Sequence, residues 1–227
     1  MIRIALAGTM LAMAAPALAQ TQPSAQQPLV APMGGGWPDA IEDRENAPVA
    51  KSRARFVAQQ AGTCVADKSP AKSGDVLMLE PGSSRYRAAV KSLTEANAYC
   101  FGARGKPRDS NLMFLGALAE RVLAQDPAPL NARLARAAGG AEMVTFGPAE
   151  RITACVARSA PDDVAALLAT KLASAEEKAA ADKLTVVLGA CARGGQPLSA
   201  NIDALRAAIA VAAFRSIQTS PALVAGN

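Results

Sequence analysis

Four cysteines are the residues of this chain whose type and spacing best define a chemistry. Cys64 and Cys100 have 35 residues between them, and so do Cys155 and Cys191. Four cysteines can form two disulfides in three different pairings. A metal site with four cysteine ligands is the alternative, but such ligands come in close pairs and the chain contains no Cys-x-x-Cys. The spacing therefore favours two disulfides and an oxidising compartment.

Histidine is absent from the whole sequence, which excludes several reaction classes. Ser-His-Asp and Cys-His triads cannot be built, and neither can zinc or haem sites ligated by histidine. Cysteines joined in disulfides supply no thiol nucleophile. The groups left for an enzyme are carboxylates, or a serine paired with a lysine.

A serine and a lysine do occur at the spacing used by serine acylases, in Ser69-Pro-Ala-Lys72. The partner motifs Ser-Asp-Asn and Lys-Thr-Gly are missing, and a proline lies inside the match. We therefore interpret this stretch as a polar loop. The run from Gly102 to Lys106 superficially resembles a phosphate loop, but it lacks the full G-x4-G-K-[ST] spacing and a preceding strand. We expect it to end a helix.

Charged residues form three groups: an acidic group near the N-terminus (Glu42, Asp43, Glu45), a second acidic group (Asp162, Asp163, Glu176, Glu177) and a basic run (Lys51, Arg53, Arg55). Two acids held across a cleft can hydrolyse glycosides, and a basic run can bind an anionic polymer. However, acids are also preferred in the first turn of helices, and a basic run is typical of a solvated helix face. We favour these structural interpretations.

The two cysteine pairs belong to an internal repeat. The second copy begins 91 positions after the first, and the copies align without a gap from one cysteine to the other. The matching residues are Cys-Val-Ala at the start, Pro70 with Pro161, Leu77 with Leu168, Ser83 with Ser174, Leu93 with Leu184, and the second cysteines. If each copy descends from a self-sufficient unit, Cys64 pairs with Cys100 and Cys155 with Cys191. Tyr86 is replaced by Glu177 in the second copy, which indicates divergence.

Apolar residues at helical spacing predict an all-α fold of two tandem four-helix modules, with one disulfide in each. The first helix of each module carries the first cysteine, and a short second helix follows Pro70 or Pro161. The third helix begins at Ser83, or at the capping box Ser174-Ala-Glu-Glu177, and is expected to run to the second cysteine. The fourth helix follows a short loop.

The predicted organisation is a signal peptide at 1–19, a flexible leader at 20–48, module 1 at 49–125, a linker at 126–146, module 2 at 147–217 and a flexible tail at 218–227. The first segment has Arg3, an apolar run too short to span a bilayer, and small residues before Gln20. This layout is typical of a secretory signal cleaved after Ala19 and predicts a periplasmic or secreted protein without a transmembrane segment in the mature chain. The linker contains one expected short helix, from Asn131 to Ala138.

Composition argues against a nucleic-acid partner. The net charge is only +5 and is not clustered, and the eight aromatic residues are too few for a base-stacking platform. No motif calls for a cofactor or a metal ion.

The repeat unit has Cys-Val-Ala at its head, a proline six residues after the cysteine, and a second cysteine before a glycine-rich turn. In these features it resembles a group of alanine-rich exported alphaproteobacterial proteins with a duplicated Cys-x35-Cys helical module. The resemblance covers roughly Arg55 to Arg215. It implies no known activity and transfers no site residues.

Together these observations predict a non-catalytic binding or structural protein of the cell envelope, with an envelope protein or peptide as partner and a groove between helices as its surface. Two alternatives stay open. A carboxylate-dependent hydrolase of envelope polysaccharide would need a cleft with two acids, at least one with a raised pKa. A carrier of a small apolar ligand would need a dry pocket lined by Leu, Val and Met between the modules.

Overall fold

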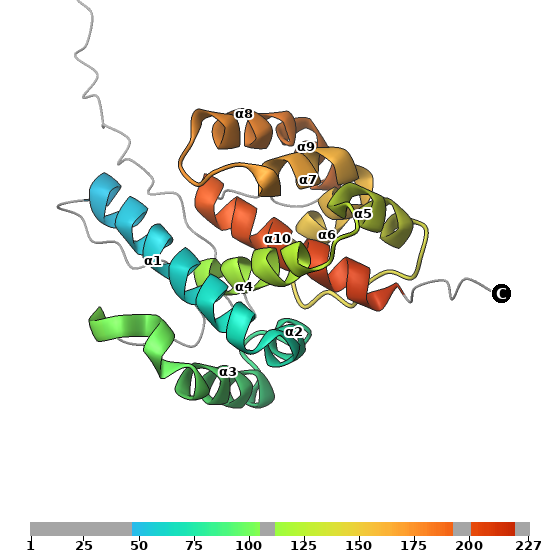
Figure 1. Ribbon diagram of the computed structural model, residues 1–227. Coiled ribbons are helices and arrows are strands. Elements are labelled where there is room, and N and C mark those ends of the chain that lie inside the picture. The colour runs from blue at the N-terminus through green and yellow to red at the C-terminus, as the bar shows by residue number, and fades with distance from the viewer. Residues whose placement is uncertain (1–46, 105–111, 193–200, 221–227) are drawn as a thin grey trace, which may run out of the picture. The chain divides into compact units, whose positions relative to one another are not determined.

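The computed structural model describes residues 47–104, 112–192 and 201–220, and their side chains except those of 47–52, 103 and 104. These residues form helices and connecting turns with no strand among them (Figure 1), so the predicted all-α class is confirmed. The predicted signal peptide, the leader up to position 46 and its acidic group lie outside the described residues, as do Lys106 and the chain after position 220.

The first half of the described chain contains α1 (Ala47–Lys68), α2 (Pro70–Leu77), α3 (Ser84–Ala96), the 3-10 helix η1 (Ala98–Arg104) and α4 (Leu112–Gln125). Pro70 occupies the first turn of α2, where its missing N–H costs no hydrogen bond. Ser83 caps α3 by accepting a hydrogen bond from the Tyr86 backbone N–H at 3.1 Å.

The prediction that the third helix runs to Cys100 is wrong. Helix α3 ends at Ala96, and Cys100 lies in η1. The Asn97 side chain is buried and donates from Nδ2 to the Leu93 carbonyl at 2.9 Å. An asparagine that bonds a carbonyl of the last turn competes with the helical backbone, and this ends the helix before the cysteine.

The predicted linker helix is confirmed as α5 (Leu130–Ala138). Its C-terminal carbonyls are satisfied by one guanidinium, because Arg158 donates to the carbonyl oxygens of Ala137, Ala138, Gly140 and Ala141. The positive charge of this side chain also interacts favourably with the partial negative charge at the C-terminus of α5.

The second half contains α6 (Pro148–Ser159), α7 (Pro161–Ala169), α8 (Ala175–Lys183), α9 (Thr185–Cys191) and α10 (Ile202–Thr219). Here too the long third helix is interrupted, because α8 and α9 meet at Leu184. The Leu184 N–H bonds the Ala181 carbonyl at 3.1 Å, which is the tighter spacing of a 3-10 turn. The Leu184 side chain at this interruption is completely buried.

Helices α4 and α10 form the centre of the packing, with α1 against α4 and α6 against α10 (Figure 1). Glycine permits the closest approaches. A Cβ atom on Gly62 of α1 would lie 2.4 Å from the Ala117 Cβ, and one on Gly116 of α4 would lie 2.5 Å from the Ala207 Cβ of α10. Buried residues of both halves belong to one hydrophobic cluster, so the halves share a core.

The two expected disulfides are present, Cys64–Cys100 and Cys155–Cys191, with Cα–Cα distances of 5.7 and 5.8 Å. Each joins the first helix of its half to the segment carrying the second cysteine. This equivalence agrees with an internal repeat, although common descent of the two copies stays a prediction. None of the described helices has the length and apolar character needed to cross a bilayer.

Candidate functional site

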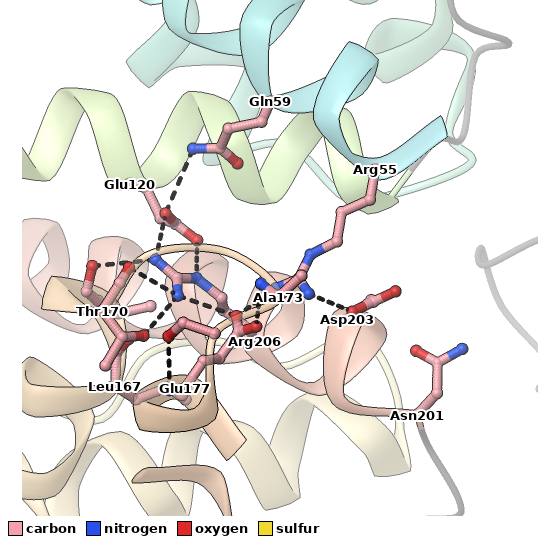
Figure 2. Close-up of polar contacts among 12 residues, drawn as sticks. Arg55, Gln59, Glu120, Leu167, Thr170, Ala173, Glu177, Asn201, Asp203 and Arg206 are labelled. Carbon is pink, nitrogen blue, oxygen red and sulfur yellow. Dashed lines mark hydrogen bonds and ion pairs between the residues drawn. The ribbon is translucent and has the colours of Figure 1, made fainter. Parts of the chain in front are cut away.

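A buried cluster of ion pairs lies where the two halves of the described chain meet (Figure 2). Arg55 of α1 enters this cluster with only 7% of its side chain exposed. Its Nη2 contacts Glu177 Oε1 on α8, and its Nη1 lies 2.5 Å from Asp203 Oδ1 on α10. One guanidinium therefore ties three helices together.

A second guanidinium, that of Arg206 on α10, extends the cluster to α4. Arg206 forms a bidentate pair with Glu120, in which Nε donates to Oε1 at 2.8 Å and Nη2 donates to Oε2 at 3.0 Å. Its Nη1 donates to Glu177 Oε1 at 2.9 Å and to the Thr170 hydroxyl at 2.9 Å. Two-pronged arginine–carboxylate pairing fixes geometry as well as charge.

Glu177 is the shared acceptor, and the start of α8 positions it. Ser174 caps the helix by accepting from the Glu177 backbone N–H at 3.1 Å. The Glu177 Oε2 in turn accepts from the backbone N–H of Ala173 at 2.8 Å, and Ala173 has a φ of 57°, in the left-handed region that favours glycine. The predicted capping box is therefore present in a modified form, with the carboxylate bonding the residue before the cap.

Electrostatic interactions keep two members of the cluster, Glu177 and Arg206, in their charged states. Burial by itself would raise the pKa of Glu177, but hydrogen bonds from Arg55, Ala173 and Arg206 outweigh it and keep that pKa below the ordinary glutamate value. Burial would likewise lower the pKa of Arg206, yet Glu120 and Glu177 raise it. Glu177 and Arg206 therefore act as fixed charges near neutral pH.

An open cleft of about 650 Å³ lies over this cluster. Its lining comes from α1 (Arg55), the start of α8 with the residues before it (Ala173, Ser174, Ala175, Glu177, Lys178, Ala181, Asp182), the start of α9 (Thr185) and the start of α10 (Ile202, Asp203, Leu205). Alanine and aliphatic side chains make one part of the wall, and the ion-paired groups make the rest. By contrast, a second space that Arg55 lines, between α1, α4 and α10, has a volume of only about 10 Å³, room for a single water molecule.

A separate buried ion pair lies away from the cleft lining. Arg215 of α10 contacts Glu150 of α6, and the guanidinium stacks over the Phe146 ring at 4.6 Å from its centroid. Burial raises the pKa of Glu150, against the opposing effects of the Phe146 N–H and Arg215. Burial lowers the pKa of Arg215. This pair joins α6 to α10.

The structure does not bring the serine–lysine candidates together. Ser69 stands at the start of α2, and its hydroxyl exchanges hydrogen bonds with the Asn97 side chain, at 3.1 Å from Nδ2 and 3.3 Å to Oδ1. Lys72 is exposed on α2. The serine therefore links α2 to the end of α3. The polar-loop interpretation is wrong, because Ser69 is the cap residue of α2 and Lys72 lies in the first turn of that helix.

The residues of the second acidic group and of the basic run do not stay together in the fold, and some of them pair with residues from other segments. Asp162 lies in the first turn of α7 and accepts from Asn131 Nδ2 at 2.8 Å, while Glu176 is exposed in the first turn of α8. The solvated-face interpretation of the basic run is wrong for Arg55, which is buried, although Arg53 is exposed. Glu177 also does more than complement a helix end, because it is the hub of the cluster.

Sequence reasoning missed that Arg55 and Glu177 are partners. The available signal was the divergence of the repeat, since Glu177 occupies the place of the buried Tyr86. A carboxylate that replaces a core aromatic has to find cationic partners elsewhere in the fold.

The fold and the cleft define an all-α protein with two disulfides and an interhelical cleft over a charged floor. Among the described residues, no group of three or more carboxylate or cysteine side chains could hold a metal ion. Comparisons with protein-family models, curated proteins and solved structures found no match. The geometry of this site is therefore the feature that bears on function.

Proposed function

We propose that the protein is a non-catalytic binding protein of the cell envelope, exported to the periplasm or secreted after cleavage of its signal peptide. In this proposal the cleft between α1, α8 and α10 receives a segment of an envelope protein or peptide. The observation that carries the proposal is the cleft itself, with aliphatic wall residues beside charges held in ion pairs. The two disulfides support an oxidising compartment.

The state of the cleft acids favours binding over hydrolysis. A glycoside hydrolase needs a carboxylic acid with a raised pKa facing the substrate. In the cleft, the pKa of Glu177 is lowered, Asp203 is paired with Arg55, and Asp182 is paired with Lys178. Glu150 has a raised pKa, but its carboxylate is occupied by Arg215 and the Phe146 N–H and does not line the cleft.

The space between the halves gives little support to an apolar carrier. Such a carrier needs a dry cavity large enough for its ligand, whereas the space at the α1–α4–α10 junction holds about 10 Å³ and is lined in part by Arg206 and Glu120. The larger cleft is open, and charged groups lie along its floor. An open cleft of this kind suits a peptide segment better than a small apolar molecule.

Site-specific crosslinking tests the proposal. A photo-crosslinking amino acid at Thr185, on the cleft wall, should capture one envelope protein or peptide in intact cells. Ala175→Trp should abolish that crosslink by filling the cleft rim from an exposed position, whereas Ala88→Trp, on the exposed side of α3, should not. Replacing all four cysteines with serine should also weaken capture.

Crosslinks that survive Ala175→Trp, or the absence of any crosslink from Thr185, would contradict the proposal. Circular dichroism of both tryptophan variants controls for loss of the fold. Turnover of an envelope polysaccharide that disappears in Asp203→Asn, with the fold intact, would instead establish the hydrolase.

A further inference from the structure

The charges along the cleft are not balanced. Its described lining contains two cations, Arg55 and Lys178, against three carboxylates, Glu177, Asp182 and Asp203. Within the described lining, carboxylates therefore outnumber cations by one, although the chain as a whole carries +5. Local excess charge of sign opposite to that of the rest of the surface selects a partner of complementary charge.

Asp203 is the carboxylate best placed to use this excess. It lies in the first turn of α10, where the cap residue Asn201 satisfies the Ala204 N–H at 2.8 Å. Its Oδ1 faces Arg55, and its other oxygen points away from the guanidinium (Figure 2). The side chain is 24% exposed, whereas that of Glu177 is 1% exposed. A carboxylate oxygen can accept further hydrogen bonds, so Asp203 can bind a second cation without losing Arg55.

The two cations of the lining are already committed. Arg55 binds both Glu177 and Asp203, and Lys178 Nζ lies 2.6 Å from Asp182 Oδ2 on the same helix. An anionic ligand would meet the three carboxylates of the described lining, and both cations that it could reach already bind carboxylates. A cationic ligand would displace nothing and would reduce the local repulsion between acids.

We propose that the cleft selects a partner segment in which a basic side chain, Lys or Arg, lies between apolar side chains, and that the cation binds Asp203. This inference rests on the proposed function and specifies the chemistry of the partner. The apolar side chains of the segment contact Ala181, Ile202 and Leu205, which line the same cleft. Asp203 thereby determines specificity, while the aliphatic wall supplies contact area.

Three synthetic peptides that differ in one residue test the inference. Each has the same alanine- and leucine-rich sequence with a central Lys, Gln or Glu, and binding is followed by fluorescence anisotropy. The wild-type protein should bind the Lys peptide about tenfold more tightly than the Glu peptide, because an opposite charge is gained and a like charge avoided. Added salt should reduce that ratio.

Matched variants separate the role of Asp203 from general effects. Asp203→Asn should weaken binding of the Lys peptide about fivefold and bring the Lys and Gln peptides to equal affinity. Asp203→Glu should retain the preference for Lys. Asp162→Asn is the control, since Asp162 holds the equivalent first-turn position of α7 outside the cleft and should leave all three affinities unchanged.

The outcomes distinguish this inference from the proposed function. Equal binding of all three peptides, preference for the Glu peptide, or an unchanged preference in Asp203→Asn would overturn charge selection while a Thr185 crosslink could still form. A Thr185 crosslink whose yield is unaffected by Asp203→Asn would overturn it as well. Absence of both peptide binding and the Thr185 crosslink would overturn the two proposals together.

Discussion

Removing the charge of Glu177 should reveal how much the buried cluster stabilises the fold. In Glu177→Gln the two arginines lose their common carboxylate, and hydrogen bonds to charged groups contribute about 1.5–3 kcal/mol each. The loss is partly offset, because Arg206 keeps its two bonds to Glu120 and Arg55 keeps Asp203. We therefore expect a decrease of about 3 kcal/mol in the free energy of unfolding, at the lower end of the range for breaking a buried ion pair.

Urea unfolding followed by far-ultraviolet circular dichroism measures this loss. With a urea dependence of about 2 kcal/mol per molar, the midpoint should fall by about 1.5 M. Glu176→Gln is the matched control, because Glu176 is the preceding residue in the same first turn but is exposed. Its midpoint should stay close to that of the wild type.

A double-mutant cycle with Arg55→Met separates the ion pair from the two individual side chains. The coupling energy between Arg55 and Glu177 should be at least about 1 kcal/mol, since the two residues are in direct contact and buried. Equal midpoints for Glu177→Gln and Glu176→Gln, or a coupling energy near zero, would refute the view that the cluster holds α1 to α8.

Three other outcomes are expected. Because the pKa of Glu177 is below its ordinary value of 4.5, its contribution to stability is present above pH 4.5 and is lost as the pH falls through the lower pKa of the folded state. Glu177→Gln should therefore make the free energy of unfolding less dependent on pH in this acidic range, as measured by urea titrations at several pH values. Gly116→Ala should cost about 2 kcal/mol, since its Cβ would lie 2.5 Å from a side chain of α10, whereas Gly189→Ala on α9 has open space and should be neutral or slightly stabilising in the same assay. Removing one disulfide with Cys64→Ser and Cys100→Ser should cost about 4 kcal/mol in the chain-entropy model, seen as a lower thermal midpoint, and an unchanged midpoint would contradict the entropic account.

Local rules made the helices predictable. Pro70 and Pro161 start helices because their fixed φ suits the first turn, and Ser83 and Ser174 cap helices by accepting a backbone N–H. The disulfide pairing followed from the repeat, since equivalent cysteines in equivalent helices have equivalent neighbours. These features depend on residues close in sequence or on the internal repeat.

The errors of sequence reasoning occurred where a side chain bonds across the local pattern. The third helix was expected to be continuous in both copies, because its apolar stripe is continuous. In the first copy the Asn97 amide donates to the Leu93 carbonyl, and in the second the Leu184 N–H bonds the Ala181 carbonyl with the spacing of a 3-10 turn. Apolar periodicity predicts which face of a helix is buried. It does not predict where a side chain competes with the backbone hydrogen bonds of the helix.

By itself, then, the sequence determined an all-α chain, its helix starts and its two disulfides. Only the tertiary structure decided the ion cluster and the cleft above it. Arg55 and Glu177 are 122 positions apart, and Arg206 and Glu120 are 86 apart. No local sequence preference brings such residues together. They meet because α1, α4, α8 and α10 pack around a shared core, and charged side chains buried there need partners of opposite charge.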